Sequence, residues 1–209
     1  MSDLILEFYS EEIPSRMQKK ASIDLKDIFI NGLDLAGLDY SKINTFVTPR
    51  RLTLIVKDLS NSSNSYYEEK RGPRVGSPEK ALEGFTRSLN IDKNSLFIKK
   101  EKKGEFYFYK FLQKGNSAKD IIAKISSDII TNFPWNKSMR WGEGNLRWVR
   151  PLKFVYCALF KNDTSREIID LKLKEIPSVN FTLGHYMISS KKIFPKNVSD
   201  YLKKLYENK

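Results

Sequence analysis

The chain has 209 residues, of which 40% are hydrophobic, 12% aromatic and 30% charged, so it can bury a substantial core. No window approaches the roughly 18 uninterrupted apolar residues of a membrane span, and the first seven residues lack the pattern of a signal peptide. The formal net charge of +12 favours a polyanionic partner, although abundant lysine is equally typical of a general compositional bias. We therefore expect a globular cytoplasmic protein.

The N-terminal part alternates strands with one long helix. Residues 4–8 form a short apolar run that is typical of a buried strand. Pro14 suits the first turn of a helix, which we expect to end near Gly32 or Gly37. Further strands are predicted over 46–47 and 52–56, on either side of the turn at 48–50.

The middle of the chain predicts a hairpin between two helices. A strand over 66–70 is followed by a helix from Ser77 to about Leu89. Residues 96–98 and 105–112 then read as a hairpin around 102–104. Both faces of its second strand are aromatic or apolar, so we expect that strand to be covered on two sides. Ser117 opens a helix that runs to about Asn132.

The C-terminal part predicts a loop over 134–144, a long strand over 148–160, a turn at 162–164 and a strand over 168–173. Asn197 is a plausible cap for a last helix, within which the chain stops, so we expect a truncated helix over 191–209. The mixture of hairpins and helices predicts an α+β fold, with a mixed or mainly antiparallel sheet packed with helices. We expect two lobes: a sheet-containing lobe of 1–75 plus 137–190, and a helix-hairpin-helix lobe of 76–136.

Few residues are available for catalysis. His185 and Cys157 are the only histidine and the only cysteine, which is too few for a conventional triad, a zinc site or a disulfide. Cys157 lies within an apolar run and is interpreted as a core residue. Glu11 and Glu12 are adjacent and cannot form a facing carboxylate pair on a helix. We predict neither catalytic residues nor a metal site.

The arginines are concentrated in the middle of the chain. Eight of the ten lie between positions 50 and 150: Arg50, Arg51, Arg71, Arg74, Arg87, Arg140, Arg147 and Arg150. Arginine provides a planar fork of five donors that suits phosphate, carboxylate or an aromatic face. The alternative for each is an ion pair with a carboxylate that orders a loop.

The densest such segment is residues 139–151, in which Trp141 and Trp148 alternate with Arg140, Arg147 and Arg150. Arginine can bind phosphate while tryptophan offers a stacking surface for a base. Internal stacking of arginine on tryptophan as a structural brace is an equally good interpretation.

Eight segments in this order resemble the glycyl-tRNA synthetase β-subunit family. They are Leu-Ile-Leu-Glu-Phe-Tyr-Ser-Glu-Glu-Ile-Pro at 4–14, Thr-Pro-Arg-Arg-Leu at 48–52, Lys-Arg-Gly-Pro at 70–73, Lys-Ala-Leu-Glu-Gly-Phe at 80–85, Lys-Gly-Glu at 103–105, Met-Arg-Trp-Gly at 139–142, Val-Arg-Pro at 149–151 and Thr-Leu-Gly-His at 182–185. None is decisive alone, but together they are specific.

The resemblance implies the N-terminal part of a β subunit that supports the charging of tRNA with glycine. It implies partners, namely a catalytic α subunit and glycine tRNA in an α2β2 assembly. ATP and Mg²⁺ would bind to the α subunit, and no cofactor is expected in this chain. The alternative is a stand-alone RNA-binding module. The residues predicted to bind RNA or the α subunit are Arg50, Arg51, Arg71, Arg74, Lys137, Arg140, Trp141, Arg147 and Arg150.

Overall fold

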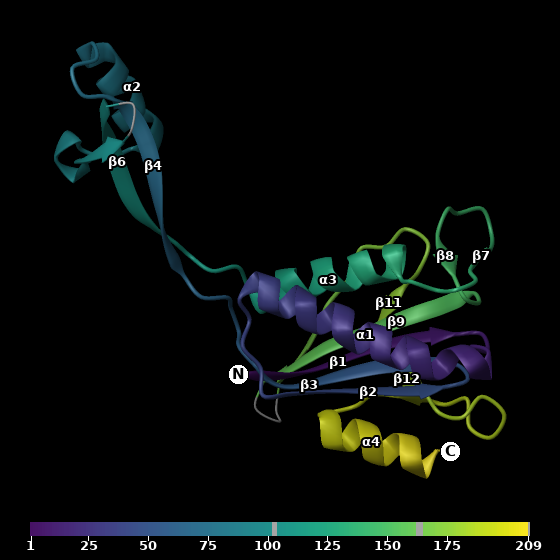
Figure 1. The fold of residues 1–209 in the computed structure, drawn as a ribbon. Coiled ribbons are helices and arrows are strands. Elements are labelled where there is room, and N and C mark those ends of the chain that lie inside the picture. Colours follow the sequence, from purple (N-terminus) through teal and green to yellow (C-terminus); the bar gives the residue numbers. More distant parts are fainter. Residues whose placement is uncertain (102–103, 162–164, 209) are drawn as a thin grey trace. The chain divides into compact units, whose positions relative to one another are not determined.

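The computed structural model describes residues 1–101, 104–161 and 165–208, which form two compact units (Figure 1). The larger unit contains Met1–Ser63 and Asn116–Lys209, and the smaller one contains Asn64–Gly115. These limits differ from the expected lobe of 76–136, because helix α3 (Ala118–Asn132) belongs to the larger unit. Ile122 and Ile130 of this helix are fully buried in the core of that unit.

The larger unit is built on one main sheet. Its strands, among the described residues, are β1 (Ser2–Ser10), β2 (Lys42–Thr48), β3 (Arg51–Leu59), β9 (Leu152–Lys161), β10 (Ser165–Ile168) and β11 (Ser178–Val179). They follow the order β10-β9-β1-β3-β2, and β11 also pairs with β9. All of these pairings are antiparallel except that of β11 with β9. The predicted α+β class is thereby confirmed.

Helices lie on both faces of this sheet (Figure 1). Helices α1 (Ser15–Ala36) and α3 lie on one face, and α4 (Val198–Glu207) lies on the other. Successive residues of a strand point to opposite faces. Leu4 and Leu6 of β1 accordingly pack in the core with α1, whereas Ile5 packs in a second core with Tyr201 of α4. The central strand is therefore buried on both sides, as its continuous apolar run predicts.

The main helix of the larger unit owes its position to one apolar stripe. Ala21, Leu25, Phe29 and Leu33 recur every four residues, so they share one face of α1, and all four are buried. Gly37 ends the helix with φ of 66°, a left-handed conformation that glycine adopts without steric cost. No helix in the described part of the chain is long and apolar enough to span a membrane.

Two of the predicted strands are shorter than expected. The strand expected over 148–160 is divided at Pro151 into two strands, β8 (Arg147–Trp148) and β9. Pro151 lacks the backbone N–H that a continuous strand would use for pairing. The strand expected over 168–173 was wrong beyond Ile168, where the chain instead buries Ile169 and Leu171 in the main core. The turn predicted at 162–164 lies outside the described residues.

Short pairings complete the larger unit. They are β7 (Met139–Arg140) with β8, and β12 (Thr182–Leu183) with β13 (Lys192–Ile193). The last helix begins at Val198 and not at 191, because the Asn197 side chain caps it by accepting a hydrogen bond from the Asp200 backbone.

The smaller unit is a three-stranded antiparallel sheet with one helix. Its elements are β4 (Tyr66–Arg74), α2 (Glu79–Leu89), a single 3-10 turn (Lys93–Ser95), β5 (Phe97–Glu101) and β6 (Gly104–Gln113), in the strand order β4-β6-β5. The predicted hairpin is present as β5 and β6, although Lys102 and Lys103 of its turn lie outside the described residues. Both faces of its second strand are partly covered: Phe108 is buried, Phe106, Tyr107, Tyr109 and Phe111 are half-buried, and Leu112 near its end is 51% exposed.

Candidate functional site

A buried carboxylate joins four elements of the larger unit. Glu7 of β1 has no exposed side-chain surface and pairs with Arg51 of β3, whose Nε lies 3.0 Å from Glu7 Oε2. The Tyr201 hydroxyl of α4 donates to the same oxygen at 2.5 Å. The Thr182 hydroxyl of β12 donates to Glu7 Oε1 at 2.6 Å. A buried charge is tolerated only when it is paired and hydrogen-bonded, and both oxygens of Glu7 meet that condition.

Electrostatics fix the protonation of the groups around Glu7. Burial opposes the Arg51 charge, but the Glu7 carboxylate more than offsets it, so the pKa of Arg51 is raised. Burial and the nearby Glu7 charge both raise the pKa of Tyr201 well above its ordinary value. Tyr201 therefore remains a hydrogen-bond donor at neutral pH. Arg51, which the sequence predicted as an RNA or subunit contact, is engaged inside the protein, where it also donates to the Leu183 carbonyl.

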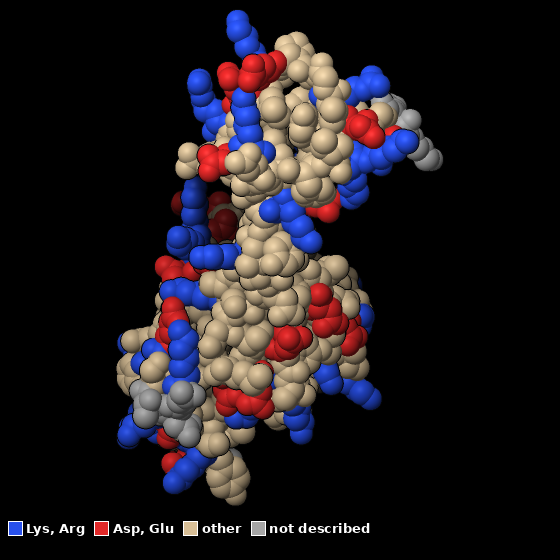
Figure 2. Space-filling model, turned by 90° about the vertical axis from the view of Figure 1, so that its left-hand side faces the viewer, with Lys and Arg blue, Asp and Glu red and all other residues tan. Residues whose placement is uncertain are grey.

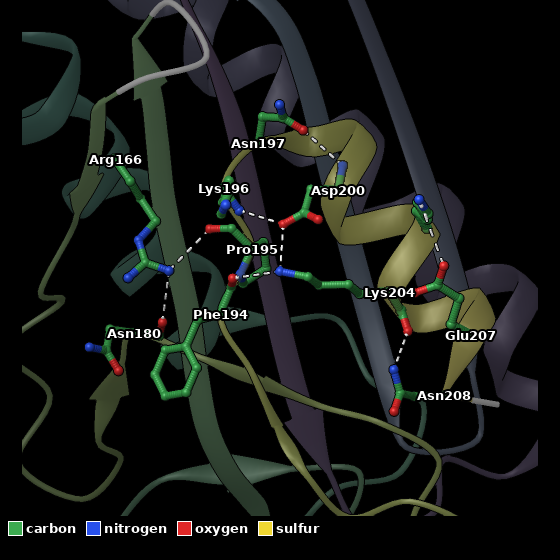
Figure 3. A network of polar contacts seen from close by, with 11 residues as sticks. Arg166, Asn180, Phe194, Pro195, Lys196, Asn197, Asp200, Lys204, Glu207 and Asn208 are labelled. Atoms are coloured by element: carbon green, nitrogen blue, oxygen red, sulfur yellow. Dashed lines mark hydrogen bonds and ion pairs between the residues drawn. The ribbon is translucent and has the colours of Figure 1, made fainter.

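A second polar network attaches α4 and the segment that precedes it (Figure 3). Arg166 Nη1 donates to the carbonyls of Asn180 and Pro195, at 3.2 and 3.1 Å. Lys204 of α4 donates to the Phe194 carbonyl at 3.2 Å and pairs with Asp200 at 2.8 Å. These bonds hold α4 along the sheet, so that its inner face forms a wall of the adjacent cavity.

That cavity has a volume of about 390 Å³, in the size range of small-molecule sites. Its walls are mainly aromatic and aliphatic, with a polar floor at the Glu7 network: Tyr9, Phe46, Arg50, Arg51, Thr53, His185, Tyr186, Tyr201, Leu202, Leu205 and Tyr206 are among the lining residues. Such a cavity can hold an apolar or aromatic group. Sequence reasoning missed it because its walls come from distant segments, and of its lining residues only Arg50, Arg51 and His185 had been considered individually.

Arg50 lies at this cavity and has several partners. Its guanidinium carbon lies 3.9 Å from the centre of the Tyr186 ring. Arg50 also pairs with Glu11 at 3.2 Å and Glu12 at 3.7 Å, and its side chain is 23% exposed. Glu11 and Glu12 therefore neutralise Arg50, as expected if this arginine forms an ion pair that orders a loop.

The tryptophans of segment 139–151 pack against the main core. Trp148 is fully buried and contacts Phe8, Phe133 and Trp135, with ring centres 5.6, 5.2 and 5.0 Å away. Trp141 is half-buried and packs against the same core. The brace reading thus holds for Trp148, but the brace is aromatic packing and not arginine stacked on tryptophan.

The basic residues of this segment are exposed and lie on and around the β7–β8 hairpin. Arg140 Nη1 donates to the Asn145 side chain at 3.3 Å, and Arg147 Nη2 donates to the Ser138 carbonyl at 3.2 Å. Lys137 and Arg150 are exposed beside them. Unlike Arg51, these four cations of segment 137–150 are exposed to solvent.

Glu175 holds the tip of this hairpin. Its carboxylate accepts hydrogen bonds from the backbone N–H groups of Asn145 and Leu146, at 2.9 and 3.1 Å. A Cβ at Gly144 would lie 2.1 Å from the carboxyl carbon, so a side chain there would displace the Glu175 carboxylate. This contact could not be predicted from the sequence, because Glu175 lies about thirty positions away.

The other predicted arginines, Arg71 and Arg74, lie in the smaller unit. Arg71 lies over the Phe106 ring at 3.7 Å and pairs with Glu101 at 3.1 Å. Arg74 is exposed beside Gly104, whose missing side chain leaves room for the guanidinium. On the face shown in Figure 2, Lys and Arg side chains are interspersed with Asp and Glu.

Nothing in the described residues assembles a catalytic centre. Cys157 is fully buried in the main core, as predicted, and burial raises the pKa of its thiol. His185 Nδ1 accepts a hydrogen bond from the Met187 backbone at 3.3 Å. Residues 1–101, 104–161 and 165–208 contain no group of three or more His, Cys, Asp or Glu side chains that could hold a metal ion.

Comparison with known proteins identifies the family of this chain. The family model "Glycyl-tRNA synthetase beta subunit" matches residues 4–209. The chain is 43% identical over 205 residues to the glycine–tRNA ligase β subunit of Ruegeria sp. (strain TM1040), and 42% identical to that of Paracoccus denitrificans (strain Pd 1222). The alignments cover 98% of this chain and 30% of each relative. The chain belongs to the glycyl-tRNA synthetase β-subunit family, in which it corresponds to the N-terminal part.

Proposed function

We propose that this chain supports the charging of tRNA with glycine, as the N-terminal portion of a glycyl-tRNA synthetase β subunit. Its role is to dock to the catalytic α subunit, to glycine tRNA, or to both. The observation that carries the proposal is the family match, which extends over residues 4–209. The assembly is an α2β2 complex in the cytoplasm.

The surface that best supports docking is the hairpin segment 137–150. Its exposed cations Lys137, Arg140, Arg147 and Arg150 are held by a rigid support, because Trp148 anchors the hairpin in the core and Glu175 fixes its tip. A preorganised set of charges loses less conformational entropy on binding than mobile side chains do. This support favours a docking role over that of a merely solvated face.

In this proposal the α subunit supplies the chemistry that requires ATP and Mg²⁺. Mg²⁺ sites are usually built from carboxylates together with substrate phosphates. The described residues offer no cluster of acidic groups of that kind and do not fit such a site. In this proposal the chain contributes binding and orientation, and we assign it no step of the chemical reaction.

Two binding measurements test the proposal. The chain is co-expressed with an α subunit of the family and purified through a tag on one partner, and its binding to glycine tRNA is measured at several salt concentrations. We expect co-purification, salt-sensitive tRNA binding, or both. Absence of both would refute the docking role.

Matched variants test the proposed surface. Arg140→Ala with Arg147→Ala should weaken the observed interaction by at least tenfold. Lys19→Ala with Lys26→Ala removes the same charge from the exposed side of α1 and should have a much smaller effect. Equal losses of binding in the Arg140/Arg147 and Lys19/Lys26 double variants would show that binding depends only on the net charge of the chain.

A further inference from the structure

Three cations lie over three aromatic rings on one face of the smaller sheet. Arg71 lies over Phe106 at 3.7 Å, Lys110 over Tyr67 at 4.7 Å, and Lys99 over Phe108 at 5.5 Å from the ring centre. The register explains their shared face. Arg71 and Phe97 are both opposite Phe108, and Lys99 is opposite Phe106, so that side chains two positions apart along each strand point the same way. We call this surface the cation–aromatic face.

The helix of the smaller unit packs beside β4. Gly72 lies in a bulge of β4 next to Arg71, and the Phe85 ring of α2 fills the space beside it. A Cβ at Gly72 would come within 2.7 Å of that ring. Glycine at this position therefore allows α2 to approach β4 closely.

Ion pairs cross the cation–aromatic face from one edge strand to the other. Lys99 of β5 pairs with Glu69 of β4 at 2.6 Å, and Arg71 of β4 pairs with Glu101 of β5 at 3.1 Å. All four side chains are more than one-third exposed. Exposed pairs of this kind contribute little net stability, so another anion can replace the carboxylates at small cost.

The chemistry of this face matches an unpaired nucleic-acid strand. Aromatic rings on a sheet provide stacking surfaces for bases, and adjacent cations bind the phosphates between them. Among the described residues of the face, Arg71, Arg74, Lys99 and Lys110 outnumber Glu69 and Glu101, so the surface is complementary to a polyanion. A protein partner is less suitable, because lysine is depleted in the cores of protein–protein interfaces.

We propose that the cation–aromatic face of the smaller unit binds an unpaired segment of RNA, with bases stacked on the exposed rings and phosphates at Arg71, Lys99 and Lys110. Tyr67, which is 66% exposed, is the ring most open to a base. This inference rests on the proposed role in tRNA charging, which it deepens by naming the surface that handles RNA.

The test uses the whole chain with a single-stranded oligouridylate of about ten nucleotides, a length typical of such platforms, and separately with glycine tRNA. Lys99→Gln with Lys110→Gln removes two charges from the cation–aromatic face. Lys70→Gln with Lys100→Gln removes two charges from the opposite face and serves as the matched control. Tyr67→Ala tests stacking, with its neighbour Tyr66→Ala on the opposite face as control.

We expect the Lys99/Lys110 variant to bind the oligonucleotide at least tenfold more weakly, with a smaller salt dependence, and Tyr67→Ala to weaken binding at least fivefold. Both controls should stay within about twofold of the unmodified chain, and melting curves verify that all variants fold. Equal losses on both faces, or no binding of the oligonucleotide at low salt, would overturn the proposal. If either of these results is found while the chain still co-purifies with the α subunit, the cation–aromatic face is wrongly assigned but the proposed function stands. Failure of this inference is therefore distinguishable from failure of the proposed function. Loss of α-subunit binding in the Lys99/Lys110 variant, with RNA binding unchanged, would show that the face binds protein and would also overturn it.

Discussion

Glu7 and Arg51 form an ion pair at the centre of the larger unit, with Arg51 Nε 3.0 Å from Glu7 Oε2 and no exposed surface on the Glu7 side chain. Tyr201 adds a hydrogen bond to Glu7 from α4, 194 positions along the chain. The pair therefore does more than join two neighbouring strands. It ties the last helix to the central strand, and Arg51 of the pair also lines the cavity beside Arg50.

Removal of the Glu7 charge should destabilise the larger unit strongly. In Glu7→Gln, Arg51 remains buried without its counter-charge, so we expect the free energy of unfolding to fall by about 3–5 kcal/mol. Denaturation in urea, followed by circular dichroism, measures the change. Glu11→Gln is the control, because Glu11 pairs with Arg50 and Lys153 near the surface and should cost less than about 1 kcal/mol. A loss of similar size in both variants would contradict the assignment of Glu7 as the anchor.

Alkaline pH should weaken the fold through three buried groups. The pKa of Tyr201 is raised by burial and by the Glu7 charge, and burial raises the pKa values of Cys157 and Tyr156. The folded state thus holds these protons more tightly than the unfolded state. The resulting stability is complete below the ordinary values of 9.0 for cysteine and 10.0 for tyrosine, and it is lost as pH rises above them.

Unfolding measured between about pH 7 and pH 11 should therefore show a constant stability that declines at the alkaline end. Tyr201→Phe should be less stable at neutral pH by about 1.5–3 kcal/mol, because it lacks the hydrogen bond to a charged group. It should also show a shallower alkaline decline. An unchanged decline in this variant would mean that Tyr201 does not contribute to it.

The Arg–Trp segment should separate into a structural part and a surface part. Trp148→Ala removes a fully buried ring and should lower the free energy of unfolding by about 3–5 kcal/mol. Arg140→Ala and Arg147→Ala should change it by less than about 0.5 kcal/mol each, since both side chains are exposed. Thermal or chemical denaturation distinguishes these cases, and a large loss of stability in the arginine variants would show that they are braces.

Glu175 should control the order of the hairpin tip. Glu175→Ala removes the acceptor for the N–H groups of Asn145 and Leu146, so amide hydrogen exchange at these two residues should accelerate markedly. Gly144→Ala should have a similar effect, because its Cβ would collide with the Glu175 carboxylate. The exposed neighbour Glu143→Ala should leave the exchange unchanged. Slow exchange at Asn145 in the Glu175 variant would show that other contacts fix the tip.

Much of the fold was predictable, because its signals are local. The apolar run at 4–8 and the caps at Ser117 and Asn197 act over a few residues, and the structure contains the strand and both helices. The cap at Ser117 is visible as a hydrogen bond from the Asp120 backbone to the Ser117 hydroxyl at 3.2 Å. Such short-range geometry is determined by neighbouring residues.

The candidate sites were less predictable from the same residues. The sequence singled out Arg51 and Trp148 for their chemical types, but one proves to be paired with Glu7 and the other packs in an aromatic core. The exposed cations Arg140 and Arg147 remain candidates. A residue type indicates which contacts it can make, whereas burial decides whether a partner outside the protein can reach it.

By itself, the sequence determined the α+β class, most of the strands and helices, and the family to which the chain belongs. The tertiary structure decided which residues meet. It placed helix α3 on the main sheet and brought Tyr201 and Thr182 to Glu7 over separations of 194 and 175 positions. It also put Arg71, Lys99 and Lys110 on one face of the smaller sheet through strand register. The reason is physical: hydrogen-bonded turns and side-chain alternation depend on adjacent residues, but partners across a core depend on which elements pack together.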